Sequence, residues 1–321
     1  MKEQDDIQEK IFKIVQVFLK NPPLIVWGSG ATISFGLPSM WNLNESLKKE
    51  IKDFDISNVN LEDELGKEKY REKLPQIKQT IWNQVNNADI LVLKKIIANE
   101  TNEFNGIQLL VEKFIEAHPK VLNIVTTNYD RVLEYVLAHN CIDFTDGFEG
   151  KTLSIFDDAN FQDRNIVNLV KVHGSLNWFN VSGDVRYLSN EIATETPQIV
   201  VPSKNKFEET YNPPYRELIK KSDNLINSTL SFLVVGFGFN DQHLTPEIKK
   251  SIKKGVPLVL ITKEISSNTY EELKNAKKYI LFEEAAIGKT RVIYKENSSS
   301  EQIEEIIDGD FWQLNKFMEI L

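Results

Sequence analysis

Cysteine is almost absent from this chain of 321 residues, in which Cys141 is the only one. A lone cysteine excludes an intramolecular disulfide and any zinc site built from several cysteines. The sequence also lacks an apolar run close to the roughly 20 residues that a membrane-spanning helix needs. The opening residues, MKEQDD, are acidic where a secretory signal peptide is basic, so we expect a cytoplasmic protein.

Positive charge and histidine are also scarce. The chain has 38 Lys and Arg against 47 Asp and Glu, a formal net charge of −9. This balance supplies no general surface for neutralising phosphates, so we expect no direct nucleic-acid binding, although a local basic patch is compatible with it. No two of the four histidines show metal-ligand spacing with a carboxylate, and we therefore predict no metal site.

The first 120 residues are mainly helical in pattern. Residues 5–20 carry apolar side chains at helical spacing and end at Pro22-Pro23, and a short apolar strand, 24–27, follows. Residues 42–120 are charged and helical, without a convincing strand, and we interpret them as a helical insertion within one domain that spans 1–321. Its apolar residues form a core of their own, an oligomer surface or a lid; they include Leu74, Ile81, Trp82 and Leu91 to Leu93.

Apolar, β-branched runs dominate the second part of the chain, at 121–128, 168–175, 198–203, 230–239 and 257–264. Such runs are typical of parallel strands buried on both faces, and helical segments separate several of them, at 129–139, 214–228 and 266–278. Residues 176–190 predict a hairpin, and 301–321 a closing helix. The sequence therefore predicts an α/β fold with a doubly wound, mostly parallel, Rossmann-like sheet and an all-helical insertion.

Four polar or glycine-rich clusters begin where predicted strands end: Gly28-Ser29-Gly30-Ala31-Thr32, Thr126-Thr127-Asn128-Tyr129-Asp130, His173-Gly174-Ser175 and Gly236-Phe237-Gly238-Phe239-Asn240-Asp241. Each alone has an ordinary structural explanation, such as a tight turn, a helix N-cap or close packing. The carboxyl ends of parallel strands share one edge, where ligands bind. Their coincidence at that edge favours a nucleotide site.

A dehydrogenase is disfavoured. The G-x-G-x-x-G fingerprint fails at its third glycine, which is Ile33 here. The helical insertion also leaves no second strand to carry the acidic residue that grips the ribose about 20 positions on. These residues favour nucleotide binding without hydride transfer.

The motifs GSGAT with Gly36-Leu37-Pro38, TTNYD, HG and GFGFND resemble, in this order, those of the Sir2 (sirtuin) superfamily, over about residues 22–265. More narrowly, the chain resembles bacterial Sir2-like NAD⁺ hydrolases of anti-phage defence. The resemblance implies catalytic roles for Asn128, Asp130 and His173. It also implies NAD⁺ contacts at Gly28, Ser29, Gly30, Ala31, Thr32, Thr127, Gly236, Phe237, Gly238, Phe239 and Asp241.

Three departures from deacylating sirtuins matter. The stretch after His173-Gly174 is the predicted hairpin instead of a four-cysteine zinc module, so no zinc is expected. Residues 36–41, GLPSMW, lack the Asp and Arg of the sirtuin motif, and Thr127 replaces a Gln. The resemblance therefore implies an NAD⁺ glycohydrolase rather than a peptide-lysine deacylase. Two alternatives stay open: a sirtuin-type deacylase or ADP-ribosyltransferase, and a sensor that binds NAD⁺ or ADP-ribose without chemistry.

The chemistry of NAD⁺ cleavage suits these residue types. Nicotinamide in NAD⁺ is a cationic leaving group, so breaking its bond to ribose needs little acid catalysis. Asn128 can position a water, His173 can act as its general base, and Asp130 can accept a hydrogen bond from the carboxamide. From the resemblance we also expect a homo-oligomer and a partner such as a HerA-type ATPase or another sensor of a defence system.

Overall fold

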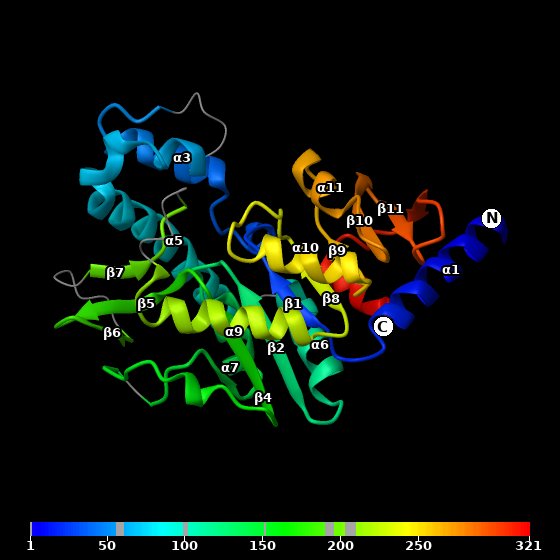
Figure 1. Ribbon diagram of the computed structural model, residues 1–321, viewed down its shortest axis with the longest axis horizontal. Helices are drawn as coiled ribbons and strands as arrows, with labels where there is room; N and C mark the ends of the chain where they lie inside the picture. Colours follow the sequence, from blue (N-terminus) through cyan, green and yellow to red (C-terminus); the bar gives the residue numbers. More distant parts are fainter. Residues whose placement is uncertain (1, 56–60, 99–101, 151, 190–195, 203–209) are drawn as a thin grey trace.

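A nine-stranded sheet organises the chain (Figure 1). The computed structural model describes all residues except 1, 56–60, 99–101, 151, 190–195 and 203–209. The strand order is β12-β11-β10-β9-β8-β1-β2-β4-β3, and neighbours from β10 to β3 are parallel. The chain winds first from β1 to one side and later, from β8, to the other. The predicted doubly wound, mostly parallel α/β sheet is thus confirmed.

The strands of this sheet are β1 (Leu24–Trp27), β2 (Val121–Thr126), β3 (Phe144–Thr145), β4 (Ile166–Lys171), β8 (Phe232–Val235), β9 (Leu258–Ile261), β10 (Tyr279–Ala286), β11 (Lys289–Lys295) and β12 (Ile303–Asp308). A separate antiparallel sheet, ordered β6-β5-β7, consists of β5 (Gly174–Val181), β6 (Asp184–Tyr187) and β7 (Thr196–Ile199). The β5–β6 hairpin confirms the one predicted over 176–190, except residue 190, which lies outside the described residues.

The α-helices are α1 (Lys2–Phe18), α2 (Gly30–Ile33), α3 (Met40–Glu50), α4 (Leu61–Leu65), α5 (Leu74–Ile97), α6 (Asn105–Ile115), α7 (Val132–His139), α9 (Tyr215–Ser228), α10 (Thr245–Lys254), α11 (Ser267–Leu273) and α12 (Leu314–Phe317). Short 3₁₀ helices are η1 (Glu68–Lys73), η2 (Asn102–Phe104), η3 (Asp158–Asn160) and η4 (Met318–Ile320).

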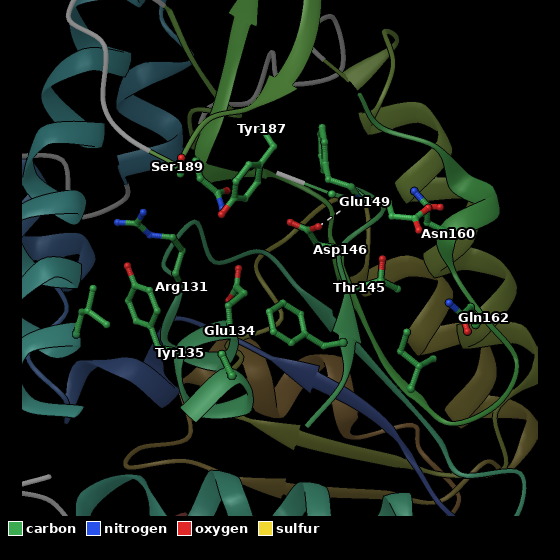
Figure 2. A pocket seen from close by; sticks show the side chains of 17 residues that line it. Arg131, Glu134, Tyr135, Thr145, Asp146, Glu149, Asn160, Gln162, Tyr187 and Ser189 are labelled. Atoms are coloured by element: carbon green, nitrogen blue, oxygen red, sulfur yellow. Dashed lines mark hydrogen bonds between the residues drawn. The ribbon is translucent and has the colours of Figure 1, made fainter. Parts of the chain in front are cut away.

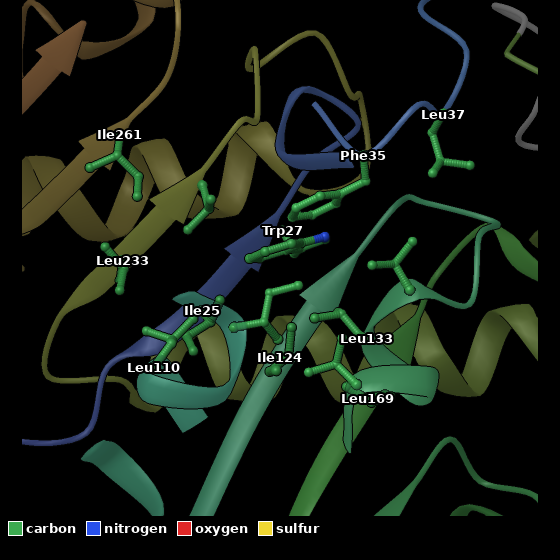
Figure 3. Close-up of a cluster of buried hydrophobic side chains, with 14 of the residues drawn as sticks. Ile25, Trp27, Phe35, Leu37, Leu110, Ile124, Leu133, Leu169, Leu233 and Ile261 are labelled. Atoms are coloured by element: carbon green, nitrogen blue, oxygen red, sulfur yellow. The ribbon is translucent and has the colours of Figure 1, made fainter. Parts of the chain in front are cut away.

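Alternate residues of the central strands belong to two buried hydrophobic clusters, one on each face of the sheet. In β1, Ile25 and Trp27 belong to the cluster beneath α1, α5, α6 and α7, whereas Leu24 and Val26 belong to the cluster beneath α9 and α10. Figure 3 shows Trp27 and Ile25 packed among neighbours such as Leu133. Burial on both faces is what the continuous apolar runs predict.

The predicted helical region 42–120 contains only helices and turns among its described residues. Its buried side chains are continuous with the core of the sheet. Trp82 of α5 is 2% exposed, donates from Nε1 to the Leu176 carbonyl oxygen (2.9 Å) and packs edge-on against Phe179. Ile81 belongs to the same cluster, whereas Leu91 is 59% exposed. Treating 42–120 as a subdomain stays a prediction, but its core is shared.

Two predicted elements are wrong. The run at 198–203 was expected in the parallel sheet, but β7 ends at Ile199 and pairs antiparallel with β5 in the small sheet. The expected closing helix over 301–321 is instead strand β12, a turn, and the one-turn helix α12 with η4. Strands β10 and β11, which no pattern flagged, join β12 to the sheet.

Candidate active site

The carboxyl ends of four adjacent parallel strands bring the predicted clusters together. Strands β8, β1, β2 and β4 are neighbours in this order and run in the same direction. The residues that follow them therefore meet at one edge, as predicted. One boundary differs, because β4 ends at Lys171 and Gly174-Ser175 already begins β5. His173 consequently lies in the two-residue link between the large and small sheets.

The glycines after β1 and β8 are required by the packing of two turns against each other. Gly28 N–H donates to the Val235 carbonyl oxygen and Gly30 N–H to the Gly236 carbonyl oxygen, both at 2.9 Å. A Cβ on Gly28 would lie 2.4 Å from that Gly236 oxygen. Gly236 has φ +59°, and its Cβ would lie 2.1 Å from the Ala31 nitrogen. These glycines thus set the shape of the edge before any ligand is considered.

This packing also limits how the turn can hold a phosphate. Besides Gly28 and Gly30, Ala31 N–H donates within the protein, to the Gly28 carbonyl oxygen (3.1 Å), and Thr32 N–H to that of Ser29 (3.1 Å). Helix α2 has only four residues, too few for a substantial dipole. Ser29 and Gly30 are the exposed residues of the turn. Any contact with a phosphate would therefore come mainly from these two residues.

Asn128, Thr32 and Asp130 form a buried polar network below the turn. Asn128 Nδ2 donates to the Gly28 carbonyl oxygen (3.2 Å) and to Thr32 Oγ1 (3.4 Å), and Thr32 Oγ1 donates to Asp130 Oδ2 (3.2 Å). Asn128 is 6% exposed, and its Oδ1 has no hydrogen-bond partner among the residues that the structure describes. A buried amide oxygen left in this state is an acceptor ready for a ligand hydroxyl or a water. Thr127 precedes it, half-buried.

Both carboxylate oxygens of Asp130 accept hydrogen bonds from the protein itself. Asp130 Oδ1 accepts from the N–H of Val132 (3.3 Å), the first residue of α7, in a local turn before the helix, whose N-cap is Arg131. Burial raises the pKa of the Asp130 carboxyl to about 7, against the opposing charge of Lys171. The Lys171 ammonium donates to the Asp130 carbonyl oxygen (2.6 Å) and pairs with Glu134. This buried Lys171–Glu134 pair was not predicted.

His173 is paired with Asp241, a partner that sequence reasoning missed. Its Nε2 lies 3.1 Å from Asp241 Oδ2, although the alignment is poorer than in a regular hydrogen bond. Asp241 Oδ1 accepts from the backbone N–H groups of His243 and Leu244, each at 2.9 Å, which fixes the carboxylate. Asp241 was predicted to contact NAD⁺; its observed neighbour is His173. The imidazole ring of His243 lies 5.9 Å from that of His173.

The two aromatic side chains of the turn after β8 face the interior. Phe237 and Phe239 are 6% and 3% exposed and belong to the core cluster beneath α9 and α10. Their side chains pack in that core, so only the backbone of this turn is placed to border a ligand. Gly238 accepts from Thr269 Oγ1 through its carbonyl oxygen (2.9 Å). The NAD⁺ contacts predicted at 236–239 therefore remain a prediction, and only for the backbone of these residues.

The sequence profile of the SIR2-like domain matches residues 122–282, half of the chain. The chain belongs to the SIR2-like domain family. The match contains Asn128, Asp130, His173 and Asp241, and the glycine turn after β1 precedes it. A search of curated proteins found no relative of similar sequence.

Solved structures with a related fold are distant in sequence. Sir2Tm bound to a propionylated peptide has 14% identity and a TM-score of 0.46, over 80% of this chain and 88% of that one. A complex of a Sir2 homologue with NAD has 14% identity and a TM-score of 0.44, over 80% of this chain and 82% of that one.

In the described part of the chain, no helix is long and apolar enough to cross a membrane, and no three His, Cys, Asp or Glu side chains are grouped to hold a metal ion.

Proposed function

We propose that the SIR2-like domain binds NAD⁺ as its substrate at this edge and hydrolyses the bond between nicotinamide and ribose. One observation carries the proposal: the unpartnered Asn128 oxygen and the His173–Asp241 pair follow neighbouring strands of one parallel sheet. A pure binding module has no need of an imidazole held by a buried carboxylate. The family membership and the motif resemblance support NAD⁺ as the nucleotide.

The residues divide the chemistry between them. The unpartnered Oδ1 of Asn128 accepts a hydrogen bond from the attacking water and orients it toward the anomeric carbon. His173 takes the proton of that water, and the carboxylate of Asp241 stabilises the imidazolium that forms. The electron pair of the broken C–N bond leaves with nicotinamide, which is thereby neutral. The products are nicotinamide and ADP-ribose.

Incubation with NAD⁺, with nicotinamide and ADP-ribose followed by chromatography, tests the proposal. We expect release by the wild type and loss of release in both Asn128→Ala and His173→Ala, with NAD⁺ binding retained. Exposed His139 on α7 provides a matched control, because His139→Ala removes an imidazole far from the strand ends. The proposal fails if NAD⁺ binds saturably but no products form, both with the protein alone and with a co-expressed partner protein. The domain would then be a sensor and not a hydrolase.

For the biological role we infer NAD⁺ depletion as the effector step of bacterial anti-phage defence in the cytoplasm. The motif resemblance supports this, together with regulation by a homo-oligomer or a HerA-type ATPase partner. Infection of cells carrying wild type or His173→Ala tests it. We expect cellular NAD⁺ to fall after infection only with the wild type, and unchanged NAD⁺ in both strains would contradict the defence role.

A further inference from the structure

A cavity lies apart from the strand-end residues, between α7, the loop after β3 and the β5–β6 hairpin. Its volume is about 580 Å³, within the range of small-molecule sites. Its wall includes Arg131 and Glu134 but not Asn128, His173 or the glycine turn. Figure 2 shows Arg131, Glu134 and Tyr187 surrounding the space beside Asp146. Neither the proposed hydrolysis nor the packing of the core uses this space.

The charge that the cavity offers a ligand is negative. Glu134 and Asp146 are 9% and 7% exposed, and Glu149 stands at the exposed rim. The one guanidinium in the wall, that of Arg131, is engaged by Asp89, with Nη2 2.7 Å from Oδ2. Burial raises the pKa of the Asp146 carboxyl to about 6; the charge of Glu134 acts in the same direction, and that of Lys171, which pairs with Glu134, opposes it. A cation beside Asp146 would relieve this cost, whereas an anion would add to it.

The residues that line the cavity include two side chains whose acceptors are poorly matched within the protein. Asn177 of β5 is 6% exposed and lines the cavity, and its Oδ1 has no hydrogen-bond partner within the described chain. In the part of the chain that the structure describes, Asp146 Oδ2 accepts a single long bond from Trp178 Nε1 (3.4 Å), and Oδ1 accepts from Phe148 N–H (3.2 Å). Buried acceptors in this state are matched by N–H or O–H groups of a ligand.

Aromatic rings stand next to the carboxylate. Phe148 and Tyr187 both line the cavity, with ring centroids 6.5 Å apart, and Trp178 lies behind Phe148 at 4.9 Å. Aromatic faces attract organic cations through the quadrupole of the ring. A volume of about 580 Å³ is far larger than a single metal ion requires.

We propose that this cavity is a second ligand site, for a small organic cation whose N–H or O–H donors reach Asn177 and Asp146 and whose ring lies against Phe148 and Tyr187. The proposal is independent of NAD⁺ hydrolysis, because no residue assigned to that reaction lines the cavity.

Three probes that share an indole ring test the charge preference: tryptamine (cation), tryptophol (neutral) and indole-3-acetate (anion). Calorimetric titration of the full chain should show tryptamine binding roughly tenfold more tightly than tryptophol, and no binding of indole-3-acetate. Equal affinities for the three probes, or no binding of tryptamine, would overturn the proposal.

Two variants with opposite expected effects locate the binding. Asp146→Asn should weaken tryptamine binding roughly tenfold, and Asn177→Asp, which adds a carboxylate, should strengthen it. Asp184→Asn makes the same change on the exposed end of β6 and should leave binding unaltered. Because His173→Ala should also leave it unaltered, failure of the hydrolase and failure of this site are distinguishable. Tryptamine binding that neither Asp146→Asn nor Asn177→Asp changes would place it elsewhere and refute the assignment.

Discussion

Asp241, in the loop before α10, places its carboxylate beside His173. The variant Asp241→Asn tests whether this carboxylate positions the imidazole. The amide oxygen of Asn can keep accepting from His243 and Leu244, so the loop is preserved, but its NH₂ group now faces His173 Nε2. We expect kcat for NAD⁺ to fall roughly tenfold or more with KM little changed, because the imidazolium loses its carboxylate and the amide NH₂ favours the tautomer whose other nitrogen already carries the proton.

Asp241→Ala serves as the comparison, because it removes both the carboxylate oxygen beside His173 and the one that accepts from the loop backbone. It should lower the melting temperature as well as kcat, whereas Asp241→Asn should lower kcat alone. The pH profile of kcat gives the second readout: because a general base acts only when deprotonated, a shifted acidic limb in Asp241→Asn indicates positioning of the base. An unchanged profile with normal kcat would assign Asp241 a purely structural role.

The buried Asp130 carboxyl makes stability depend on pH. Burial raises its pKa to about 7, with Asp89 and Glu134 acting in the same direction and Lys171 opposing. The folded protein therefore keeps this proton to a higher pH than the unfolded chain, where the group ionises near 4, and the free energy of unfolding falls as pH rises between these values. Asp130→Asn removes this loss. Relative to wild type, the variant should gain roughly 1–3 kcal/mol on going from pH 5 to pH 8 in urea titrations.

Which residues gather at the site was predictable, but their partners were not. Asn128 and His173 follow buried apolar runs, and parallel strands place such positions at one edge irrespective of the loops between them. The pairing of His173 with Asp241 depends on the path of the loop before α10, and that of Lys171 with Glu134 on how α7 lies on the sheet. No local sequence pattern encodes either path.

At the scale of elements, the contact between the turns after β1 and β8 shapes the whole edge. Gly236→Ala has two unfavourable effects: it puts a side chain on a residue with φ +59°, and it places a Cβ 2.1 Å from the Ala31 nitrogen. The two turns must therefore separate. We expect a loss of roughly 2 kcal/mol or more in the free energy of unfolding, with weakened NAD⁺ binding. Gly238→Ala is the control: its Cβ would lie 3.2 Å from the Asn240 side chain, which can move. Equal stability of the two variants would contradict this account.

Of the strands that no pattern flagged, β12 has a weak sequence signal, whereas β10 begins with the buried apolar run Tyr279 to Phe282. The central strands are buried on both faces and read as apolar runs. Strand β12 lies at the edge and carries Glu304, Glu305 and Asp308 among its isoleucines, which resembles the surface of a helix. The run at 198–203, whose last residue lies outside the described residues, places Ile199 and Val201 in the large core cluster, and hydrophobicity alone does not indicate which sheet a strand joins.

For the whole molecule, the decisive question is whether region 42–120 folds with the sheet. Trp82 links the two, since its indole N–H donates to Leu176 of β5 and its ring packs on Phe179. If the core is continuous, Trp82→Ala should destabilise the entire chain by roughly 3–5 kcal/mol, in one transition. Urea unfolding followed in parallel by tryptophan fluorescence and far-UV circular dichroism measures both the size and the cooperativity of the effect.

Leu91→Ala on the same helix is the matched control, because Leu91 is 59% exposed and its truncation should change the free energy of unfolding by less than about 0.5 kcal/mol. Coincident fluorescence and dichroism curves for wild type and Trp82→Ala would show that α5 and the sheet unfold together, which makes the helical region part of the structure that holds the strand-end site. Separate curves, with only the first transition shifted by Trp82→Ala, would instead establish 42–120 as an independently folding subdomain and leave the edge of the sheet intact when that subdomain opens.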